Sequence, residues 1–412
     1  MNQMDKKEEI VYIGNFLYPD GNAAAHRVVS NGRLFRLLGY KTTFIGLDKN
    51  TKDSDNLENT RIIYDDLEGY SIPYPNGIKG WLSYKTQFRK VKCFLEQVDN
   101  LKIVVMYGAP TISLFCTLLR KWCKENNKIL LTDAVDWLSA SVGSIPYRII
   151  KYIDTVYQKT YINSHVDGVI CVSKYLDNYY SQKGCKTVII PPLTDCNRFE
   201  RCDNTQSKAS LVYVGMPFAL NGKKVLPKDF KDRLDKVIEC LYELSEVGSD
   251  FVFNIYGLTR EQYLSVMSSH TQLLEKLDGK IVFNGSVSHD LAMKKIAEAD
   301  FSIFFRDINR GTTAGFPTKF SESISCGTPV ITTNTSDIKD YLLEGENGYF
   351  IDIDDTQKMT QKMSYILTLS KEHINNMKDN AFNSKLFDYR NYQESIKDFI
   401  DGIFQKAKKY KI

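Results

Sequence analysis

A group of residues that could bind phosphate lies between Ala314 and Glu322, where a helix is predicted to begin after a buried strand. Lys319 would bring an ammonium charge, and the free N–H groups at the helix start, on Thr318 and Lys319, would also attract an anion. Glu322, about one turn further along, could accept hydrogen bonds from vicinal ribose hydroxyls. The pattern favours binding of a nucleoside diphosphate. The ordinary alternative is a capped helix with a solvated lysine and glutamate.

A second loop of small residues follows the first predicted strand. Gly21 is followed closely by three alanines, so a ligand could approach the backbone at this helix start, although no G-x-G-x-x-G is present. Asn22, His26 and Arg27 are candidates for contact with a phosphate or an acceptor substrate. For Arg27, an ordinary position on a helix surface would be the commoner outcome.

Acidic residues offer two further kinds of chemistry. Asp133 and Asp136 follow an inner strand, where they could orient an acceptor or act as a general base, or could only cap the next helix. Two D-x-D patterns, at 53–55 and 352–354, could hold a metal ion. A lone D-x-D is weak evidence, and a solvated loop or a helix cap explains each pattern more simply. We therefore expect no metal and no cofactor.

Short apolar runs rich in β-branched residues must position these groups. Most of them are separated by segments long enough for a helix, which predicts βαβ units, parallel sheets and two doubly wound α/β domains. The proline pair 191–192 and the polar stretch 195–210 mark the linker between a domain over 1–192 and a domain over 203–391. A closing amphipathic helix is expected over 392–412. The predicted strands are 11–13, 42–45, 61–64, 103–106, 128–131, 168–172 and 187–190, then 211–214, 251–255, 280–283, 301–305 and 328–332.

Composition excludes several classes of protein. The chain has 412 residues with 43% hydrophobic and 25% charged, which is typical of a globular protein of two domains. A net charge of +4 is too small to argue for a nucleic-acid partner. Nine cysteines without a C-x-x-C pair indicate reduced thiols in a cytosol, and the five scattered histidines match no zinc motif. No G-x-S-x-G, signal peptide or uninterrupted apolar span is found.

The run 314–322 resembles the carboxyl-domain signature of retaining glycosyltransferases of the GT-B fold, the large group called glycosyltransferase family 4. The likeness is greatest to capsule, lipopolysaccharide and exopolysaccharide members with a G-x-P-x-K-x-x-E variant, here carried by Gly315, Pro317, Lys319 and Glu322. Further segments match in the order of the family, strongest over 167–352. They are 167–173, 189–195, the glycine-ended strand 211–215 followed by Lys231, and the loop 283–287.

The resemblance implies two Rossmann-like domains that face a central cleft, with the closing helix packing back on the first domain. It implies a hexosyl- or related transferase that needs no metal and moves a sugar, with retention and front-side attack, from a nucleotide-diphosphate sugar to a glycan or lipid-linked acceptor. Lys231, Lys319, Asp133 and Asp136 are the expected catalytic residues. The expected donor-binding residues are Gly21, Gly215, Gly257, Gly285, Val287, Arg306, Gly315, Phe316, Pro317, Thr318, Lys319 and Glu322.

Two departures from the family keep other functions open. Ala314 stands where the family commonly has a glutamate for donor-sugar hydroxyls, which leaves sugar identity open and motivates a catalytically silent subunit as an alternative. Met216 and Pro217 replace an arginine, so Lys231 must supply most of the charge, with 223–224 or Arg306 as candidate helpers. A nucleotide-sugar epimerase is a third hypothesis, but it would need more acids and histidines in the cleft.

A predicted helix over 79–98 carries apolar residues on one face and basic residues around them. Such a helix could lie on the inner membrane surface, which would suit a lipid-linked acceptor, although an apolar stripe is more often part of a core. We therefore expect a cytoplasmic protein that could touch the membrane peripherally.

Overall fold

A computed structural model describes residues 7–75, 77–108, 113–137, 145–204, 207–218, 220 and 230–409. The candidate helpers 223–224 lie outside these residues, as do the last three positions of the predicted closing helix. The chain divides into two compact units. The N-terminal unit comprises Met1–Thr194, Ala314–Phe316 and Tyr389–Ile412, and the C-terminal unit comprises Asp195–Thr313 and Pro317–Asp388.

The N-terminal unit is built on a sheet with the described strand order β3-β4-β2-β1-β5-β6-β7-β8. All neighbouring strands are parallel except β3, which pairs antiparallel with β4 at the edge. The strands are β1 (Glu9–Gly14), β2 (Lys41–Asp48), β3 (Ile62–Tyr64), β4 (Leu67–Pro73), β5 (Leu101–Tyr107), β6 (Ile129–Ala134), β7 (Gly168–Cys171) and β8 (Thr187–Ile189). The helices are α1 (Ala23–Leu37), α2 (Gly77–Gln97), α3 (Ser113–Glu125), α4 (Ile145–Tyr157), α5 (Lys174–Ser181) and α14 (Gln393–Lys409).

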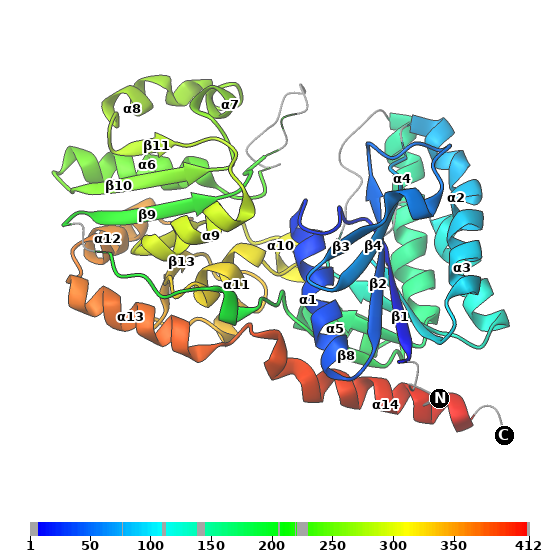
Figure 1. Ribbon diagram of the computed structural model, residues 1–412. Helices are drawn as coiled ribbons and strands as arrows, with labels where there is room; N and C mark the ends of the chain where they lie inside the picture. Colours follow the sequence, from blue (N-terminus) through cyan, green and yellow to red (C-terminus); the bar gives the residue numbers. More distant parts are fainter. Residues whose placement is uncertain are drawn as a thin grey trace. The chain divides into compact units, whose positions relative to one another are not determined.

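Both faces of this sheet are buried, which explains the continuous apolar runs of its strands. Successive residues of β1 point to opposite sides, so Ile10 and Tyr12 join a core with α1 and α14, while Val11 and Ile13 join a core with α2 and α3. The helix α14 packs closely enough on β7 that a Cβ added at Gly168 would lie 2.6 Å from the Phe399 ring. Figure 1 shows α14 beside β8 and α1.

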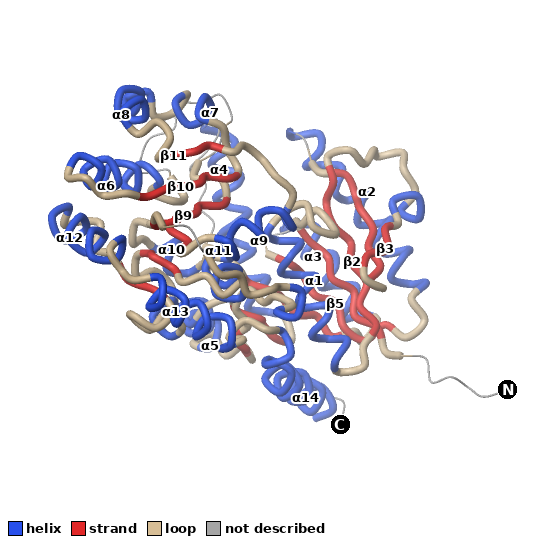
Figure 2. Tube along the Cα trace, turned by 60° about the vertical axis from the view of Figure 1, so that its left-hand side comes forward, coloured by secondary structure: helices blue, strands red, loops and turns tan. Residues whose placement is uncertain are grey.

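The C-terminal unit has a parallel sheet with the described strand order β11-β10-β9-β12-β13-β14. Helices flank the strands, as Figure 2 shows for each unit. The strands are β9 (Ala209–Val214), β10 (Phe251–Tyr256), β11 (Ile281–Phe283), β12 (Phe301–Phe304), β13 (Val330–Thr332) and β14 (Gly348–Phe350). The helices are α6 (Leu234–Glu246), α7 (Arg260–Leu264), α8 (Thr271–Lys276), α9 (His289–Glu298), α10 (Arg310–Ala314), α11 (Thr318–Ser325), α12 (Thr356–Leu367) and α13 (Lys371–Ser384).

The predicted fold class, two doubly wound α/β domains, is confirmed, with three local corrections. Two strands were not predicted from the sequence, because β4 contains a glycine and ends in proline, and β14 is only three residues long. The strand predicted over 61–64 is antiparallel rather than parallel. Asp355, rather than the 352–354 pattern, caps α12, since its Oδ1 accepts the N–H of Lys358 at 3.0 Å.

The basic helix predicted over 79–98 corresponds to α2, and its described apolar side chains belong to a core. Phe88, Val91 and Leu95 are all buried between α2 and the sheet. The structure therefore favours the ordinary interpretation of this stripe over membrane contact. Among the described residues, no helix is both long enough and apolar enough to cross a membrane.

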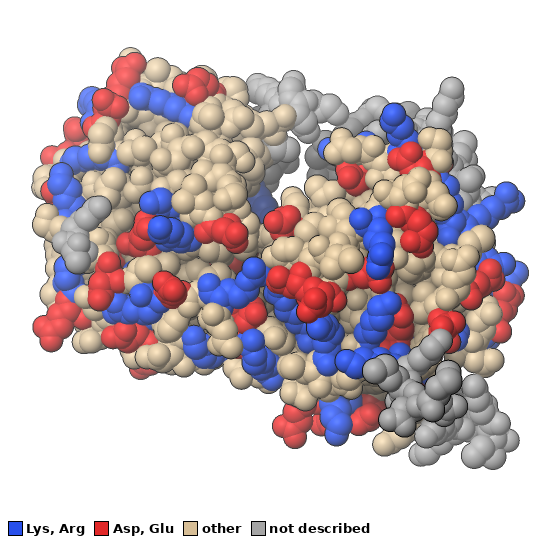
Figure 3. Space-filling view, viewed as in Figure 1, with Lys and Arg blue, Asp and Glu red and all other residues tan. Residues whose placement is uncertain are grey.

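Basic and acidic side chains are interspersed over the face drawn in Figure 3. This mixture agrees with the small net charge of +4. A surface of this kind has no long-range field of one sign to attract a polyanion, so binding of a charged ligand must depend on local arrangements of residues.

A buried lysine makes the stability of the C-terminal unit depend on pH. Lys378 of α13 is fully buried, and its Nζ donates to the carbonyl oxygens of Ala297 (2.7 Å) and Ala299 (2.6 Å). Burial lowers the pKa of Lys378 to about 8 from an ordinary value of 10.5. The unfolded chain therefore binds more protons between these values, and the free energy of unfolding rises with pH across that window.

We expect Lys378→Met to remove this rise. Relative to the variant, the wild-type protein should gain about 2 kcal/mol between about pH 7.5 and 9.5, measured by urea unfolding. Lys371→Met, at the start of the same helix, serves as the control because Lys371 is partly exposed. Parallel pH profiles for wild type and Lys378→Met would contradict the assignment.

Candidate functional site

Glycines end two adjacent strands of the C-terminal unit where backbone must approach backbone. Gly215 follows β9 with φ +135° and Gly257 follows β10 with φ +112°, a region that favours glycine. A Cβ on Gly257 would lie 2.5 Å from the carbonyl oxygen of Gly215, and the N–H of Gly257 donates to the oxygen of Gly285 at 2.7 Å. The carboxyl ends of β9, β10 and β11 therefore meet as bare backbone.

Beside these glycines, a buried carboxylate holds two cations. Asp232 accepts from Nζ of Lys319 at 2.8 Å, from Nε of Arg306 at 2.7 Å and from the hydroxyl of Tyr213 at 2.7 Å. The side chain of Asp232 is almost entirely buried. The Lys319 side chain passes over Gly215, where a Cβ would lie 2.7 Å from its Nζ. The cluster therefore depends on the strand-ending glycine as well as on its charges.

The neighbouring cations keep the Asp232 carboxyl ionised although it is buried. Burial raises the pKa of the Asp232 carboxyl, but Lys319 and Arg306, with a smaller contribution from Lys231, more than offset this and hold the pKa well below its usual range. Burial and the neighbouring carboxylate raise the pKa of Tyr213 well above its ordinary value, so its hydroxyl stays a donor. With Asp232 ionised, the cluster keeps a net positive charge toward a ligand.

Different parts of the backbone position Arg306 and Lys319. Arg306 follows β12, where its N–H donates to Oγ1 of Thr333 at 2.9 Å and its carbonyl accepts from the same hydroxyl at 2.8 Å. Lys319 stands in the first turn of α11, whose N-cap is Pro317 and has no side-chain cap. Lys231 is exposed, and its N–H donates to the carbonyl of Pro217 at 2.7 Å.

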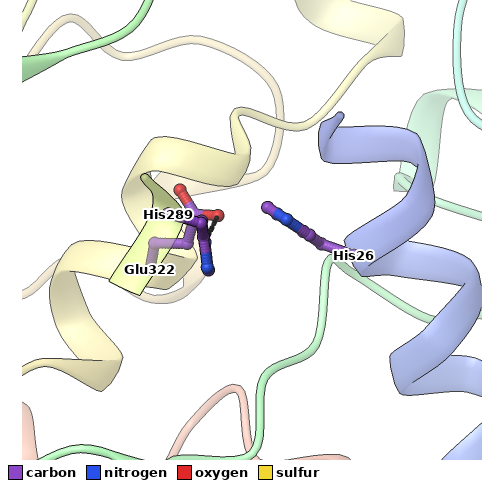
Figure 4. Close-up of side chains that lie close together, drawn as sticks. All are labelled: His26, His289 and Glu322. Carbon is purple, nitrogen blue, oxygen red and sulfur yellow. Dashed lines mark hydrogen bonds and ion pairs between the residues drawn. The ribbon is translucent and has the colours of Figure 1, made fainter. Parts of the chain in front are cut away.

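Glu322 lies one turn into α11 and faces the start of α9. Its Oε1 is 3.4 Å from Nε2 of His289, and both side chains are partly buried. Figure 4 shows this pair joined by a dashed line. A carboxylate is a hydrogen-bond acceptor, so Glu322 has the chemistry that ribose hydroxyls require.

Other predicted donor residues lie in the loops that precede α9 and α11. Gly285 and Val287 lie between β11 and α9, with Val287 packed against the core of that helix. Gly315 and Phe316 are buried and belong to the N-terminal unit, as does Ala314, whose carbonyl accepts from the hydroxyl of Ser173 at 2.6 Å. The structure therefore brings Gly215, Gly257, Arg306, Lys319 and Glu322 to the carboxyl edge of one sheet.

A pocket of about 650 Å³ opens beside this edge. It is lined by Arg306 and Thr333, by Asp307, and by both acids of the 352–354 pattern. Asp352 accepts the N–H of Asp354 at 3.0 Å, which holds the loop before α12. In the other D-x-D pattern, at 53–55, the first carboxylate accepts from the Gln87 amide at 2.6 Å.

The structure corrects the roles predicted for Asp133 and Arg27. Asp133 is fully buried and accepts from Arg27 (Nη2, 2.7 Å), Tyr12 (2.6 Å) and Asn31 (3.2 Å). Arg27 is buried too, and its Nη1 donates to the carbonyl of Ile190 at 2.8 Å. A carboxylate without exposed surface and saturated by donors has no free lone pair for an acceptor substrate. This pair ties α1 to β6 and to the backbone directly after β8.

The other residues predicted for the site in the N-terminal unit lie at several positions along it. Asn22 caps α1 through a 2.9 Å bond from the N–H of Ala25, and a Cβ on Gly21 would clash with the side chain of Leu17. His26 Nε2 lies 3.1 Å from the carbonyl of Asp20. Asp136 lines a pocket of about 250 Å³ at the carboxyl edge of the sheet, together with Asn15, Tyr107, Gln158 and Lys159.

Sequence reasoning missed two members of the site, Asp232 and His289. Asp232 stands directly after Lys231, within a segment already associated with phosphate, but a carboxylate in an anion site has no obvious role from sequence alone. His289 begins α9 after the Ser288 cap. The position of Asp232 next to Lys231 could have indicated that it belongs to the site. No residue near His289 in the sequence indicates a contact with Glu322.

The part of the chain that holds this cluster matches a known family. Residues 226–368 match the model described as "Glycosyl transferases group 1". This segment is therefore similar to that family. The matched segment contains Asp232, Arg306, Lys319 and Glu322. No curated protein sequence matches the chain.

Solved structures resemble the chain over nearly its whole length. Sucrose-phosphate synthase from Thermosynechococcus elongatus is 14% identical with a TM-score of 0.71, covering 97% of this chain and 100% of its own. Anabaena HepE in complex with UDP and glucose is 13% identical with a TM-score of 0.63, covering 96% and 100%. A glycosyltransferase from Rickettsia africae is 16% identical with a TM-score of 0.65, covering 97% and 99%. At these identities the likeness establishes the fold, which is GT-B.

Proposed function

We propose that this protein is a retaining, metal-independent glycosyltransferase of cell-surface polysaccharide synthesis. It would move a sugar from a nucleotide-diphosphate sugar to a glycan or lipid-linked acceptor. The observation that carries the proposal is the pair of cations, Lys319 and Arg306, held on buried Asp232 beside glycine-ended strands. The match of residues 226–368 to the group 1 model and the HepE structure with UDP and glucose support the same donor class.

Lys319 and Arg306 would act on the departing diphosphate. The bond between the anomeric carbon and the phosphate oxygen breaks, and negative charge develops on the leaving group. Fixed cations and the N-terminus of α11 stabilise that charge. Because Asp232 already orients both side chains, little reorganisation is needed when the donor arrives. The new bond forms on the same face of the sugar, and the acceptor hydroxyl gives its proton to the leaving diphosphate.

Glu322 and the strand ends would hold the nucleoside. The carboxylate can accept both ribose hydroxyls, and the 3.4 Å contact with His289 sets its orientation. The bare backbone of Gly215, Gly257 and Gly285 lets a flat base or a phosphate come close without a side chain in the way. In the N-terminal unit, the pocket that includes Asp136 also has polar groups on Gln158 and Lys159, which suit hydroxyl groups of a glycan acceptor.

Thermal unfolding with a panel of nucleotides tests this proposal. We expect UDP or a UDP-sugar to raise the melting temperature equally with magnesium and with EDTA, because a ligand at about 100 times its Kd stabilises by roughly 2.7 kcal/mol. GDP, ADP and CMP and their sugar conjugates are the comparison set. A shift that needs magnesium would contradict metal independence, and no shift with any nucleotide would favour a catalytically silent subunit. Sugar transfer to a lipid-linked glycan then tests the acceptor.

A further inference from the structure

A small pocket of the N-terminal unit collects neutral polar side chains from several elements. It is the pocket of about 250 Å³ that includes Asp136, and we call it the Gln158 pocket. Its lining comes from the loop after β1, the end of β5, the helices α4 and α5, and two turns between these helices, the π-helical η2 (Gln158–Ile162) and the 3-10 turn η3 (Asn163–His165). Turns of the π type often occur at functional sites. The neutral polar residues of the lining are Asn15, Tyr107, Thr155, Gln158, Asn163 and Tyr180.

Three of these side chains form a hydrogen-bonded chain that is open at both ends. The amide nitrogen of Gln158 donates to Oδ1 of Asn163 at 3.0 Å, and the amide nitrogen of Asn163 donates to the hydroxyl of Tyr180 at 3.0 Å. At one end, the Gln158 side chain is 1% exposed, and its Oε1 is buried and accepts from none of the described residues. At the other end, burial raises the pKa of Tyr180 well above its ordinary value, so its hydroxyl keeps a proton to donate. The chain therefore ends in one unused acceptor and one donor.

Unused hydrogen-bonding groups in a buried place call for a ligand that supplies partners. Folded proteins leave few buried polar groups unpaired, because each one costs free energy. Thr155 and Tyr107 are buried around the same pocket, and their hydroxyls make no hydrogen bond within the part of the chain that the structure describes. A hydroxyl group of a ligand can accept from Tyr180 and donate to Gln158 at once, because it has both a proton and lone pairs. A ligand with several hydroxyls would also serve Thr155 and Tyr107.

Charge and size narrow the class of this ligand. The charged residues among the described lining are Asp136 and Lys159, whose charges have opposite signs. The ammonium of Lys159 stands 4.3 Å from the centre of the Trp137 ring, in a cation–π contact. A buried anion needs a cation that faces it, so this lining does not favour a phosphate or a carboxylate. The volume lies below the about 300–1,000 Å³ of pockets for drug-sized ligands, which suits one ring and excludes a lipid chain.

We propose that the Gln158 pocket binds one neutral sugar ring at the end of the acceptor, with a ring hydroxyl bridging Gln158 and Tyr180. This inference rests on the proposed function, and it adds the chemical class of the acceptor's last residue. An acidic sugar or a bare lipid phosphate would not be extended. The acceptor must therefore already carry a neutral sugar, so an earlier transfer of a sugar or a sugar phosphate has to supply this substrate. The protein would extend glycans and would not begin them.

Saturation-transfer NMR on the full-length protein without nucleotide tests the pocket directly. The probes are the methyl glycosides of glucose, galactose, mannose and N-acetylglucosamine, with methyl glucuronide and inorganic phosphate as acidic probes. We expect at least one neutral glycoside to bind, and Tyr180→Phe to weaken that binding by about tenfold or more. Thr155→Val should weaken it too, without lowering the melting temperature, because its hydroxyl has no partner to lose. Tyr18→Phe is the matched control, since Tyr18 is buried and donates to the carbonyl of Leu67 at 2.8 Å, away from this pocket.

The outcomes separate this inference from the proposed function. Weaker glycoside binding by Tyr180→Phe and Thr155→Val, but not by Tyr18→Phe, supports the pocket, and Thr155→Val alone decides if Tyr180→Phe does not fold. Absence of glycoside binding means that the pocket holds only water, and tighter binding of glucuronide or phosphate contradicts a neutral ring; either result overturns the inference. A melting-temperature shift with UDP would then still support the donor site. Glycoside binding without any nucleotide shift would keep the sugar site and overturn its role as an acceptor site.

Discussion

Replacing Lys319 with alanine is expected to lower kcat for sugar transfer by about 10²-fold or more, because a fixed donor to developing charge is worth that much in a preorganised site. The fold should persist, since Asp232 keeps Arg306 and Tyr213 as partners. Steady-state kinetics with the donor identified by thermal shift provide the measurement.

Lys371→Ala is the matched control for this prediction. Lys371 also pairs with a buried carboxylate of the C-terminal unit, Asp300, at 2.6 Å, but at the start of β12 rather than at its carboxyl end. Its removal should leave kcat within about twofold of wild type, a change worth under 0.5 kcal/mol. A Lys319→Ala enzyme as active as Lys371→Ala would remove Lys319 from the leaving-group site.

The second large effect concerns Asp232→Asn. The variant leaves two cations without their buried counterion, which should destabilise the protein by about 3 kcal/mol in urea unfolding. Added UDP should then stabilise the variant more than it stabilises the wild type, because the diphosphate supplies the missing negative charge. The folded pKa of Asp232 is lowered, so its contribution is complete above the ordinary value of 3.8 and is lost as pH falls below it.

Asp300→Asn is the control variant. It shows whether the effect of UDP depends on a carboxylate at the ligand site or follows from the loss of any buried carboxylate. Asp300 is equally buried and accepts from Lys371 and from the N–H of Ser210 at 2.8 Å. Its replacement should lower stability while leaving the gain from UDP unchanged. If both variants show the same UDP gain as wild type, Asp232 has no part in preparing the cations for a diphosphate.

Local patterns predicted most of the strands and the start of α11, because burial on both faces and helix-start chemistry depend on consecutive residues. Asp232 could not be predicted in the same way. Its partners Arg306 and Lys319 lie 74 and 87 positions away, and only the order of strands brings them together. The buried pair of Arg27 and Asp133, 106 positions apart, misled the prediction for the same reason.

Helix α4 shows a different limit of sequence reasoning. Periodicity tells which side chains share one side of a helix, and it assumes that the apolar side is the one that the protein covers. In α2 that assumption holds for Phe88, Val91 and Leu95. In α4, Thr155 is buried while Ile149 and Ile153 are exposed. Only the packing of the fold distinguishes the two cases.

The place of α14 in the N-terminal core has a consequence for the order of biogenesis. Ile396, Phe399 and Ile400 complete a core whose other members, such as Ile10 and Ile170, are synthesised earlier. At about 5–20 residues per second, the roughly 200 residues between Thr194 and Tyr389 take about 10–40 s to translate. During that interval the early sheet lacks its last cover, while the C-terminal unit can already fold. The first half of the chain to emerge is therefore the last to finish folding.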